Sequence, residues 1–182
     1  MNKIIAVVGM PGAGKTEVVK IFVESGFHRV YFGDPVFERL KREGLKINEE
    51  NEKIIREKMR KEGGMDIMAR LSLPKINDCL KEGNVVVESL YSWEEYKLLK
   101  EEYGDNFKVL TVYSSPKTRY ERLEKRPVRS LSEDEARNRD YSEIENLHIG
   151  GPIAMSDFII MNEGSLEELK KKVREFIRSQ FS

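Results

Sequence analysis

The chain is 182 residues long, with 32 lysines and arginines against 32 aspartates and glutamates, so its formal net charge at pH 7 is zero. This length suits one domain with a substantial core, and the balanced charge excludes a global field that would attract nucleic acid or a membrane surface. The single cysteine, Cys79, excludes an intrachain disulfide, and no apolar run reaches membrane-spanning length. The sequence opens on a predicted strand without a leader pattern, so we expect a cytoplasmic protein.

The first predicted elements are a buried strand at residues 4–8 and a helix over residues 17–23. The loop between them follows the pattern G-x-x-x-x-G-K-T and consists of Gly9, Met10, Pro11, Gly12, Ala13, Gly14, Lys15 and Thr16. Glycines let a backbone wrap around an anion, and the N-terminus of the next helix adds partial positive charge. The alternative is a glycine-rich turn that matches by chance, but strand, loop and helix fall in the required order. We therefore predict that this loop binds ATP, with Lys15 at the β- and γ-phosphates and Thr16 on Mg²⁺.

Four more predicted strands alternate with helices, at residues 28–32, 84–88, 107–113 and 157–161. Helices are predicted over 36–43, 49–62, 65–81, 93–102 and 116–125, and from residues 133 and 166 onward, and Pro74 should kink or divide the third of them. The alternation predicts the α/β class, in the form of a three-layer P-loop NTPase fold whose five-stranded parallel sheet has helices on both faces. We expect one domain over residues 1–182, with a helical acceptor-side subdomain at 34–82 and a lid at 126–140.

Two carboxylates follow or end predicted strands, where ligands bind in parallel sheets. Asp34 follows the second strand and could orient an acceptor hydroxyl, take its proton, or hold Mg²⁺ through water; alternatively it caps the helix ahead of Pro35. Glu88 ends the third strand, where a Walker-B carboxylate lies near Mg²⁺, and the alternative role is a structural ion pair. We assign Asp34 to the acceptor, and Glu88 together with Thr16 to Mg²⁺.

Cations gather after the fourth strand, where Lys117, Arg119, Arg122, Lys125, Arg126 and Arg129 stand against only Glu121 and Glu124. Arg119, Arg122 and Arg126 have the spacing of one helical face. Beside the predicted lid, Arg119, Arg126 and Arg129 are candidates to clamp a transferring phosphoryl group. The alternative is a solvated helix face paired with its own glutamates. A nucleic-acid surface is not favoured, because no aromatic platform is interleaved with these cations.

With these residues placed, the chain resembles the P-loop kinases of small metabolites, the nucleoside monophosphate kinase superfamily. It is most similar to an archaeal family related to adenylate kinase and dephospho-coenzyme A kinase. The matching segments are residues 9–16, 33–34 and 63–66, the strand that ends at Glu88, and residues 115–119, 139–140 and 149–164. The resemblance implies that Asn162 and Gly164, in an Asn-x-Gly turn, lie against the adenine of the donor nucleotide.

The chain departs from that resemblance on the acceptor side. Relatives have an arginine three residues after the aspartate that matches Asp34, but here that position is Phe37, and Arg39 lies two residues further on. Relatives also have Asp-Gly-x-Arg after the third strand, where this chain has Glu-Ser-Leu-Tyr at 88–91. Two acceptor-side arginines are therefore missing or displaced, which argues against ordinary nucleoside monophosphate kinase activity.

Two hypotheses follow from the sequence. The first is Mg-ATP-dependent transfer of the γ-phosphoryl group to a small nucleotide-like or coenzyme-like acceptor, with the lid closing over the reaction. The second is a nucleotide-binding switch or slow ATPase that acts on a protein partner through the charged, helix-rich stretch at 43–82. The sequence favours the kinase and leaves its acceptor open.

Overall fold

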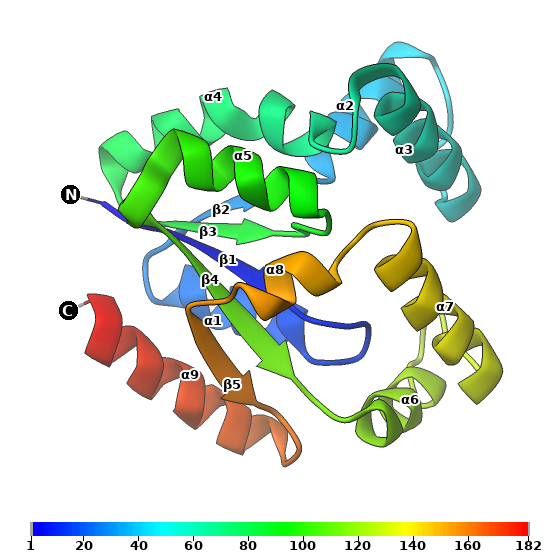
Figure 1. Cartoon of the computed structure of the whole chain (residues 1–182). Coiled ribbons are helices and arrows are strands. Elements are labelled where there is room, and N and C mark those ends of the chain that lie inside the picture. The colour runs from blue at the N-terminus through cyan, green and yellow to red at the C-terminus, as the bar shows by residue number, and fades with distance from the viewer. Residues whose placement is uncertain (1, 182) are drawn as a thin grey trace.

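The structure, a computed structural model, describes residues 2–181 and is built around one parallel sheet (Figure 1). The strands are β1 (Ile4–Val8), β2 (His28–Tyr31), β3 (Val85–Glu88), β4 (Phe107–Tyr113) and β5 (Phe158–Met161), and they lie in the order β2-β3-β1-β4-β5. All four strand pairings are parallel, so the chain returns through helices between successive strands. The predicted five-stranded parallel sheet is confirmed.

Nine helices occur in the described part of the chain. They are α1 (Lys15–Glu24), α2 (Asp34–Arg42), α3 (Glu49–Gly63), α4 (Ile67–Glu82), α5 (Trp93–Tyr103), α6 (Pro116–Glu124), α7 (Glu133–Glu145), α8 (Gly150–Ala154) and α9 (Leu166–Phe181), besides a short 3-10 turn, η1 (Gly104–Asn106). Capping boxes begin α5 and α7: the hydroxyls of Ser92 and Ser132 each accept the N–H of the glutamate three residues later, and that glutamate bonds back.

Pro74 was predicted to kink or divide its helix; it does not divide it, because it lies inside the continuous helix α4. Arg70, four residues earlier, is exposed, so water can satisfy the carbonyl that loses its hydrogen bond to the proline. Helix α8 was not predicted, because its Gly-Gly-Pro sequence is more typical of a turn.

Two hydrophobic cores lie on opposite faces of the sheet because successive side chains of a strand point in opposite directions. In β1, Ile4 and Ala6 belong to the core beneath α4 and α5, whereas Ile5 and Val7 belong to the core beneath α1 and α9 (Figure 1). All five β1 residues are at most 1% exposed. The central strand is thus held rigidly from both sides, and so is the point at which its loop begins.

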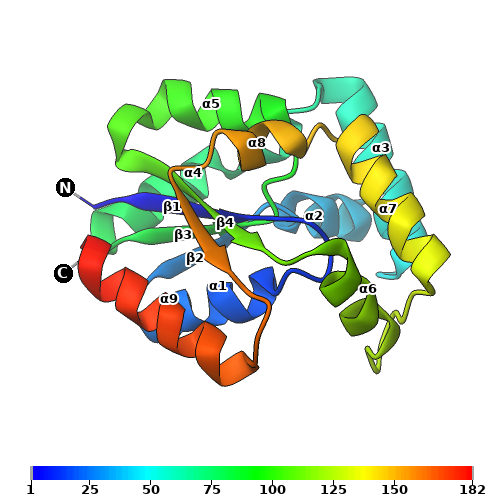
Figure 2. The same cartoon turned by 60° about the horizontal axis from the view of Figure 1, so that its bottom comes forward.

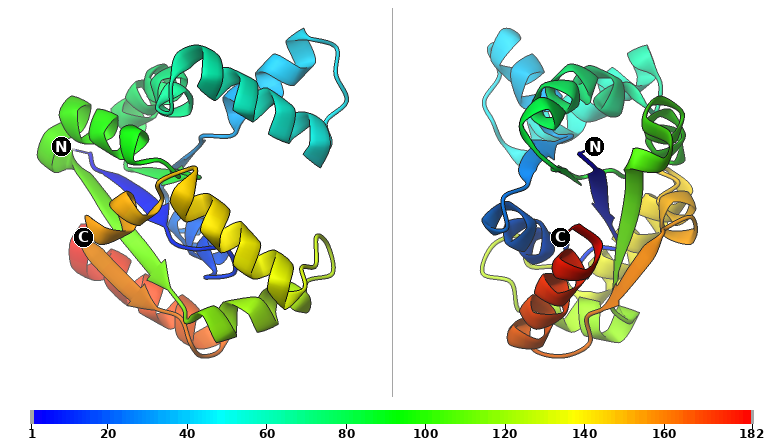
Figure 3. Two further views of the ribbon diagram at one scale, coloured as in Figure 1. Left: turned by 45° about the vertical axis from the view of Figure 1, so that its right-hand side comes forward. Right: turned by 90° about the vertical axis from the view of Figure 1, so that its left-hand side faces the viewer.

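The carboxyl ends of the strands meet at one edge of the sheet, which positions the candidate site. Register pairs Val7 of β1 and Tyr31 of β2 with Glu88 of β3, so these positions lie in one row near that edge. Figures 2 and 3 show α3 and α7 on the same side of the molecule, beyond this edge. Helices α2 to α4 span the predicted acceptor-side subdomain, and the predicted lid covers the link after α6 and the first half of α7.

No helix within residues 2–181 is long and apolar enough to cross a membrane.

Candidate active site

The loop after β1 has the backbone that its glycines predict. Gly9 has φ +144°, and a Cβ there would lie 2.3 Å from the carbonyl oxygen of Val112, so no larger residue fits. Gly14 has φ +100° and directly precedes Lys15, the first residue of α1. The free N–H groups of the first turn of α1 therefore lie beside the loop, an arrangement that binds anions such as phosphate.

Two buried side chains from other elements brace this loop. The Asn162 amide, after β5, donates to the carbonyl of Ala13 at 2.8 Å. Arg119 of α6 donates to the carbonyl of Pro11 at 3.0 Å and forms a two-point ion pair with Asp140 of α7, at 2.9 and 2.6 Å. Arg119 and Asp140 are only 3% and 5% exposed. The loop is therefore tied to α6 and to the turn after β5 before any ligand binds.

Lys15 lies at the centre of the loop. Its ammonium donates to the carbonyls of Gly9 and Met10 at 2.6 and 3.2 Å. Burial lowers the pKa of Lys15 to about 8; the Glu143 carboxylate opposes this shift, and the arginines at 139, 119 and 126 reinforce it. Because the charges of these arginines lie near the Lys15 ammonium, the loop would attract a polyphosphate anion. Thr16, in the first turn of α1, is exposed beside it.

Both predicted strand-end carboxylates make ion pairs. Asp34, the first residue of α2, accepts from the Lys75 ammonium at 2.7 Å, and its side chain makes no cap, since Gly33 occupies the N-cap position. Glu88 accepts from the Arg29 guanidinium at 2.6 Å. Residues 2–181 contain no cluster of three or more metal-ligating His, Cys, Asp or Glu side chains. Mg²⁺ beside a nucleotide needs only one or two protein oxygens, so Thr16 and Glu88 fit as its ligands.

The predicted arginine clamp is divided among three environments. Arg119 is buried in the brace described above. Arg126 lies beyond the end of α6 at Glu124, so the helical spacing does not extend to it, although its charge is close enough to act on Lys15. Arg129 has φ +56° and pairs with Glu49 of α3 at 3.3 Å, which links the predicted lid to the predicted acceptor-side subdomain. Arg122 donates to the carbonyls of Asn162 and Gly164, at 2.9 and 3.1 Å.

The predicted adenine-contact residues, Asn162 and Gly164, lie directly after β5. The Asn162 side chain is committed to the loop brace, and Gly164 is exposed. On the acceptor side, Arg39 pairs with Glu43 and, at 3.4 Å, with Glu62, so it joins α2 to α3. Phe37 packs against the core beside Tyr31, with ring centroids 6.1 Å apart.

Sequence reasoning missed a carboxylate close to Lys15. Glu143 of α7 is 6% exposed, and one of its oxygens is buried without a hydrogen-bond partner. Burial raises the pKa of the Tyr91 phenol, and the nearby charge of Glu143 raises it further, which places Glu143 near Tyr91 as well. The available signal was spacing: Ala136, Asp140 and Glu143 form a buried stripe at helical intervals in an otherwise charged helix.

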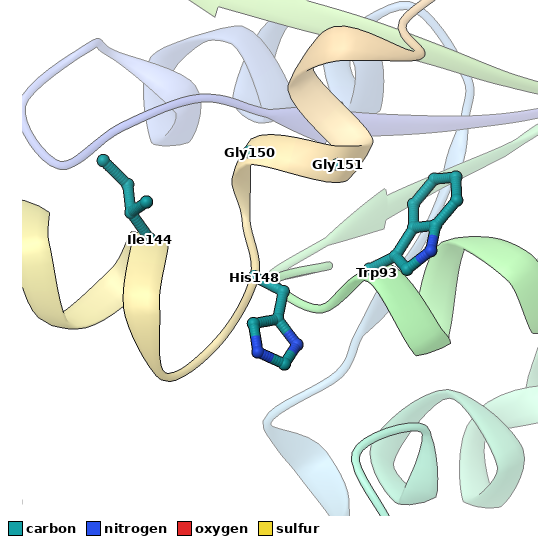
Figure 4. Close-up of a pocket in the computed structure, with 5 residues that line it drawn as sticks. All are labelled: Trp93, Ile144, His148, Gly150 and Gly151. Carbon is teal, nitrogen blue, oxygen red and sulfur yellow. The ribbon is translucent and has the colours of Figure 1, made fainter.

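A cavity of about 330 Å³ is formed by residues close to Glu143 and Tyr91 in the sequence. It is lined by Trp93, Ile144, His148, Gly150 and Gly151. Figure 4 shows Trp93 and His148 on the same side of α8, which carries the two glycines. Ile144 follows Glu143 directly, and Trp93 is two residues after Tyr91. The cavity is mostly apolar, so it suits the body of a small organic molecule better than a phosphate.

The sheet order, the phosphate-binding loop and its position at the carboxyl edge together define the class: the chain is a P-loop kinase-like domain. Two solved structures share the fold. Shikimate kinase from Bacteroides thetaiotaomicron has a TM-score of 0.62 at 14% identity, covering 97% of this chain and 98% of that one. Dephospho-CoA kinase from Campylobacter jejuni has a TM-score of 0.57 at 19% identity, covering 98% and 97%.

Sequence comparison gives the family. A family model described as an AAA domain matches residues 5–145. The UPF0200 protein of Thermococcus sibiricus is 36% identical over 176 residues, covering 93% of this chain and 91% of that protein. The chain therefore belongs to this AAA-domain family and to the UPF0200 proteins. The resemblance to P-loop kinases of small metabolites that the sequence predicts is confirmed.

Proposed function

We propose that this protein is a cytoplasmic, Mg-ATP-dependent phosphotransferase whose acceptor is a small nucleotide-like or coenzyme-like molecule. One observation carries the proposal: a glycine-rich loop holds the Lys15 ammonium on its carbonyls and is braced by the buried side chains of Arg119 and Asn162. Such bracing holds the loop in shape, so it can bind phosphates without reorganising. Electrostatic catalysis of phosphoryl transfer requires donor groups that are already in place. The kinase names of the structural neighbours support the same reaction class.

The donor half of the site is assigned to the residues of the loop. Lys15 would contact the β- and γ-phosphates, and Thr16 with Glu88 would hold Mg²⁺, which neutralises charge on the phosphates. The turn at 162–164 would border the adenine through its backbone, because the Asn162 amide already braces the loop.

The acceptor half and the lid are assigned to more distant residues. Asp34, at the start of α2, would contact the acceptor. Arg126 and Arg129 would approach the transferring group when the lid closes and excludes water, while Arg119 would act from beneath by holding the loop in shape.

A screen of acceptors tests the proposal. The purified chain is incubated with Mg-ATP and a nucleoside monophosphate, dephospho-coenzyme A or shikimate, and ADP and phosphorylated product are measured together. Lys15→Ala should abolish product formation, because it removes the charge that stabilises the phosphates in the transition state. Lys20→Ala is the matched control, since Lys20 lies on the same helix but is exposed and pairs with Glu17. Unchanged turnover in Lys15→Ala contradicts the assignment.

A second function, a nucleotide-dependent switch that acts on a protein partner, rests on one observation. Ile47, two residues before α3, and Ile54, within α3, are 65% and 52% exposed in a surface otherwise rich in charge. For a switch, ATP hydrolysis should be accelerated by a protein partner and by none of the small acceptors.

A further inference from the structure

Helix α7 turns a face carrying two carboxylates toward the phosphate-binding loop. Asp140 on this face holds Arg119, which in turn donates to the carbonyl of Pro11 in the loop. Glu143 follows Asp140 by three residues and therefore lies on the same face, one turn nearer to the end of α7. The backbone of Glu143 is also fixed, because its carbonyl accepts the N–H of Ile149 at 3.2 Å.

The Glu143 side chain has one oxygen engaged and one free. Oε1 accepts from Nε of Arg139 at 3.2 Å. Oε2 is buried and has no hydrogen-bond partner. A buried carboxylate oxygen without a donor is destabilising, and in a native protein it calls for an explanation such as a bound donor or a catalytic role.

Helix α7, docked through Asp140 and Arg119, brings the Glu143 carboxylate near both Lys15 and Tyr91. Among charged groups, this carboxylate has the largest effect on the pKa of Lys15, at the end of the phosphate-binding loop, and on the pKa of Tyr91, beyond the end of β3. The charged and titratable groups around it are Arg139 and Asp140 from α7, Lys15 from the loop, Arg119 and Arg126 from the α6 region, and Tyr91.

All three candidate carboxylates accept from a cation. Asp34 accepts from Lys75, Glu88 from Arg29, and Glu143 from Arg139. They differ in the burial of the second oxygen, because water can donate to an oxygen that is exposed. Among the three, Glu143 is the one with a buried oxygen that no donor contacts.

We propose that Glu143 is the proton acceptor for the attacking hydroxyl; this inference rests on the proposed phosphotransferase function. As the O–H bond of the acceptor breaks, its proton passes to Oε2 of Glu143. The acceptor oxygen forms the new bond to the γ-phosphorus, the bond from that phosphorus to the β,γ-bridging oxygen breaks, and ADP leaves with the electron pair. Glu143 then returns the proton to solvent or to the departing product.

The test uses the full chain with Mg-ATP and water as the acceptor, followed by whichever acceptor the screen identifies. Glu143→Gln keeps the shape and the contact with Arg139 but cannot take a proton. We expect turnover to fall at least about 100-fold, while the Kd for ATP changes less than about threefold. In the wild type, activity should fall toward acid pH as the base becomes protonated. We expect this fall to be absent from the residual activity of Glu143→Gln. Glu143→Asp should keep the fall in activity at acid pH and should lose less activity than Glu143→Gln. Glu145→Gln, exposed on the same helix, is the control and should match the wild type.

Several outcomes overturn the inference. Turnover of Glu143→Gln within threefold of wild type removes the role. If the fall in activity at acid pH persists in Glu143→Gln but disappears in Asp34→Asn, the proton acceptor is Asp34 instead. Full recovery of Glu143→Gln at high Mg²⁺ makes Glu143 a metal-holding group. If the wild type binds ATP but turns over neither water nor any acceptor, the proposed function fails first and this inference falls with it.

Discussion

The proposed donor and acceptor sides of the site are held by different kinds of contact. On the donor side, the loop is tied by hydrogen bonds from Arg119 and Asn162, which are 3% and 6% exposed. On the acceptor side, solvent-accessible ion pairs join α2 and α3 in addition to their apolar contacts. One example is Lys58 with Glu43 at 3.2 Å. Buried charge-assisted bonds fix geometry firmly, whereas exposed ion pairs contribute less than about 1 kcal/mol each.

This difference suits the two tasks of a phosphotransferase. The nucleotide presents the same phosphates in every turnover, so the loop that binds them can be rigid. A rigid loop also avoids reorganisation of its hydrogen-bond donors during the reaction. The acceptor must enter, be enclosed and leave, so helices held by weak surface contacts are better placed to move. We therefore expect substitutions on the donor side to cost more stability than substitutions between the acceptor side and the lid.

The largest expected effect on stability comes from the brace of the loop. Arg119→Met removes the guanidinium but keeps most of the volume, and it leaves the buried Asp140 carboxylate without its ion-pair partner. We expect a loss of about 3–5 kcal/mol in the free energy of unfolding, measured by urea denaturation. ATP affinity should fall as well, because the carbonyl of Pro11 loses its donor.

A double variant distinguishes this mechanism from simple loss of packing. Arg119→Met with Asp140→Leu removes both charges, so it should recover much of the stability lost in the single variant. The matched surface control is Asp134→Asn, at an exposed position of α7. A loss below about 1 kcal/mol in Arg119→Met would mean that the brace is no stronger than a surface ion pair, and the contrast between the two sides would disappear.

The second prediction concerns Glu95, which lies at 0% exposure where α5 meets the α3 region. Burial raises its pKa to about 7, while the N–H groups of Ser92 and Tyr91 and the charge of Arg60 hold the pKa down. Between about pH 4.5 and 7 the folded chain therefore binds a proton that the unfolded chain has lost, so this group makes stability fall as pH rises. We expect Glu95→Gln to match the wild type near pH 4 and to exceed it by up to about 3 kcal/mol at pH 8.

Urea titrations at both pH values measure this effect. The glutamine carbonyl can still accept the N–H groups of Tyr91 and Ser92, so the cap of α5 is retained. Glu101→Gln, exposed on the same helix, should show no such dependence on pH. Equal stability of Glu95→Gln and wild type at pH 8 would show that Arg60 compensates the buried charge, and that the acceptor side contains a tie as firm as the donor-side brace.

The sequence predicts the donor side better than the acceptor side for a physical reason. The phosphate-binding loop is contiguous, and its glycines act through local backbone geometry; the caps at Ser92 and Ser132 likewise join residues only three apart. The brace instead joins Asn162 to Ala13 across 149 residues, and nothing in the sequence near either residue encodes that contact.

The same limit applies to the carboxylates. Strand ends correctly placed Asp34 and Glu88 at the edge of the sheet, but their ion pairs with Lys75 and Arg29 depend on packing between elements. Glu143 was passed over because a glutamate in a charged helix normally faces solvent. Only the docking of α7 through Asp140 turns that side chain inward.

The smallest expected effect belongs to the contact between the lid and the acceptor side. Arg129 pairs with Glu49 at 3.3 Å, and both side chains are more than half exposed. Arg129→Ala should therefore change the free energy of unfolding by less than about 1 kcal/mol in 20 mM salt, and the change should vanish near 1 M salt, where exposed charges are screened. Lys125→Ala, exposed on the same link, is the control. A loss above about 2 kcal/mol that persists in high salt would mean that the lid and α3 are bound as firmly as the loop, so that acceptor entry would need a different moving element.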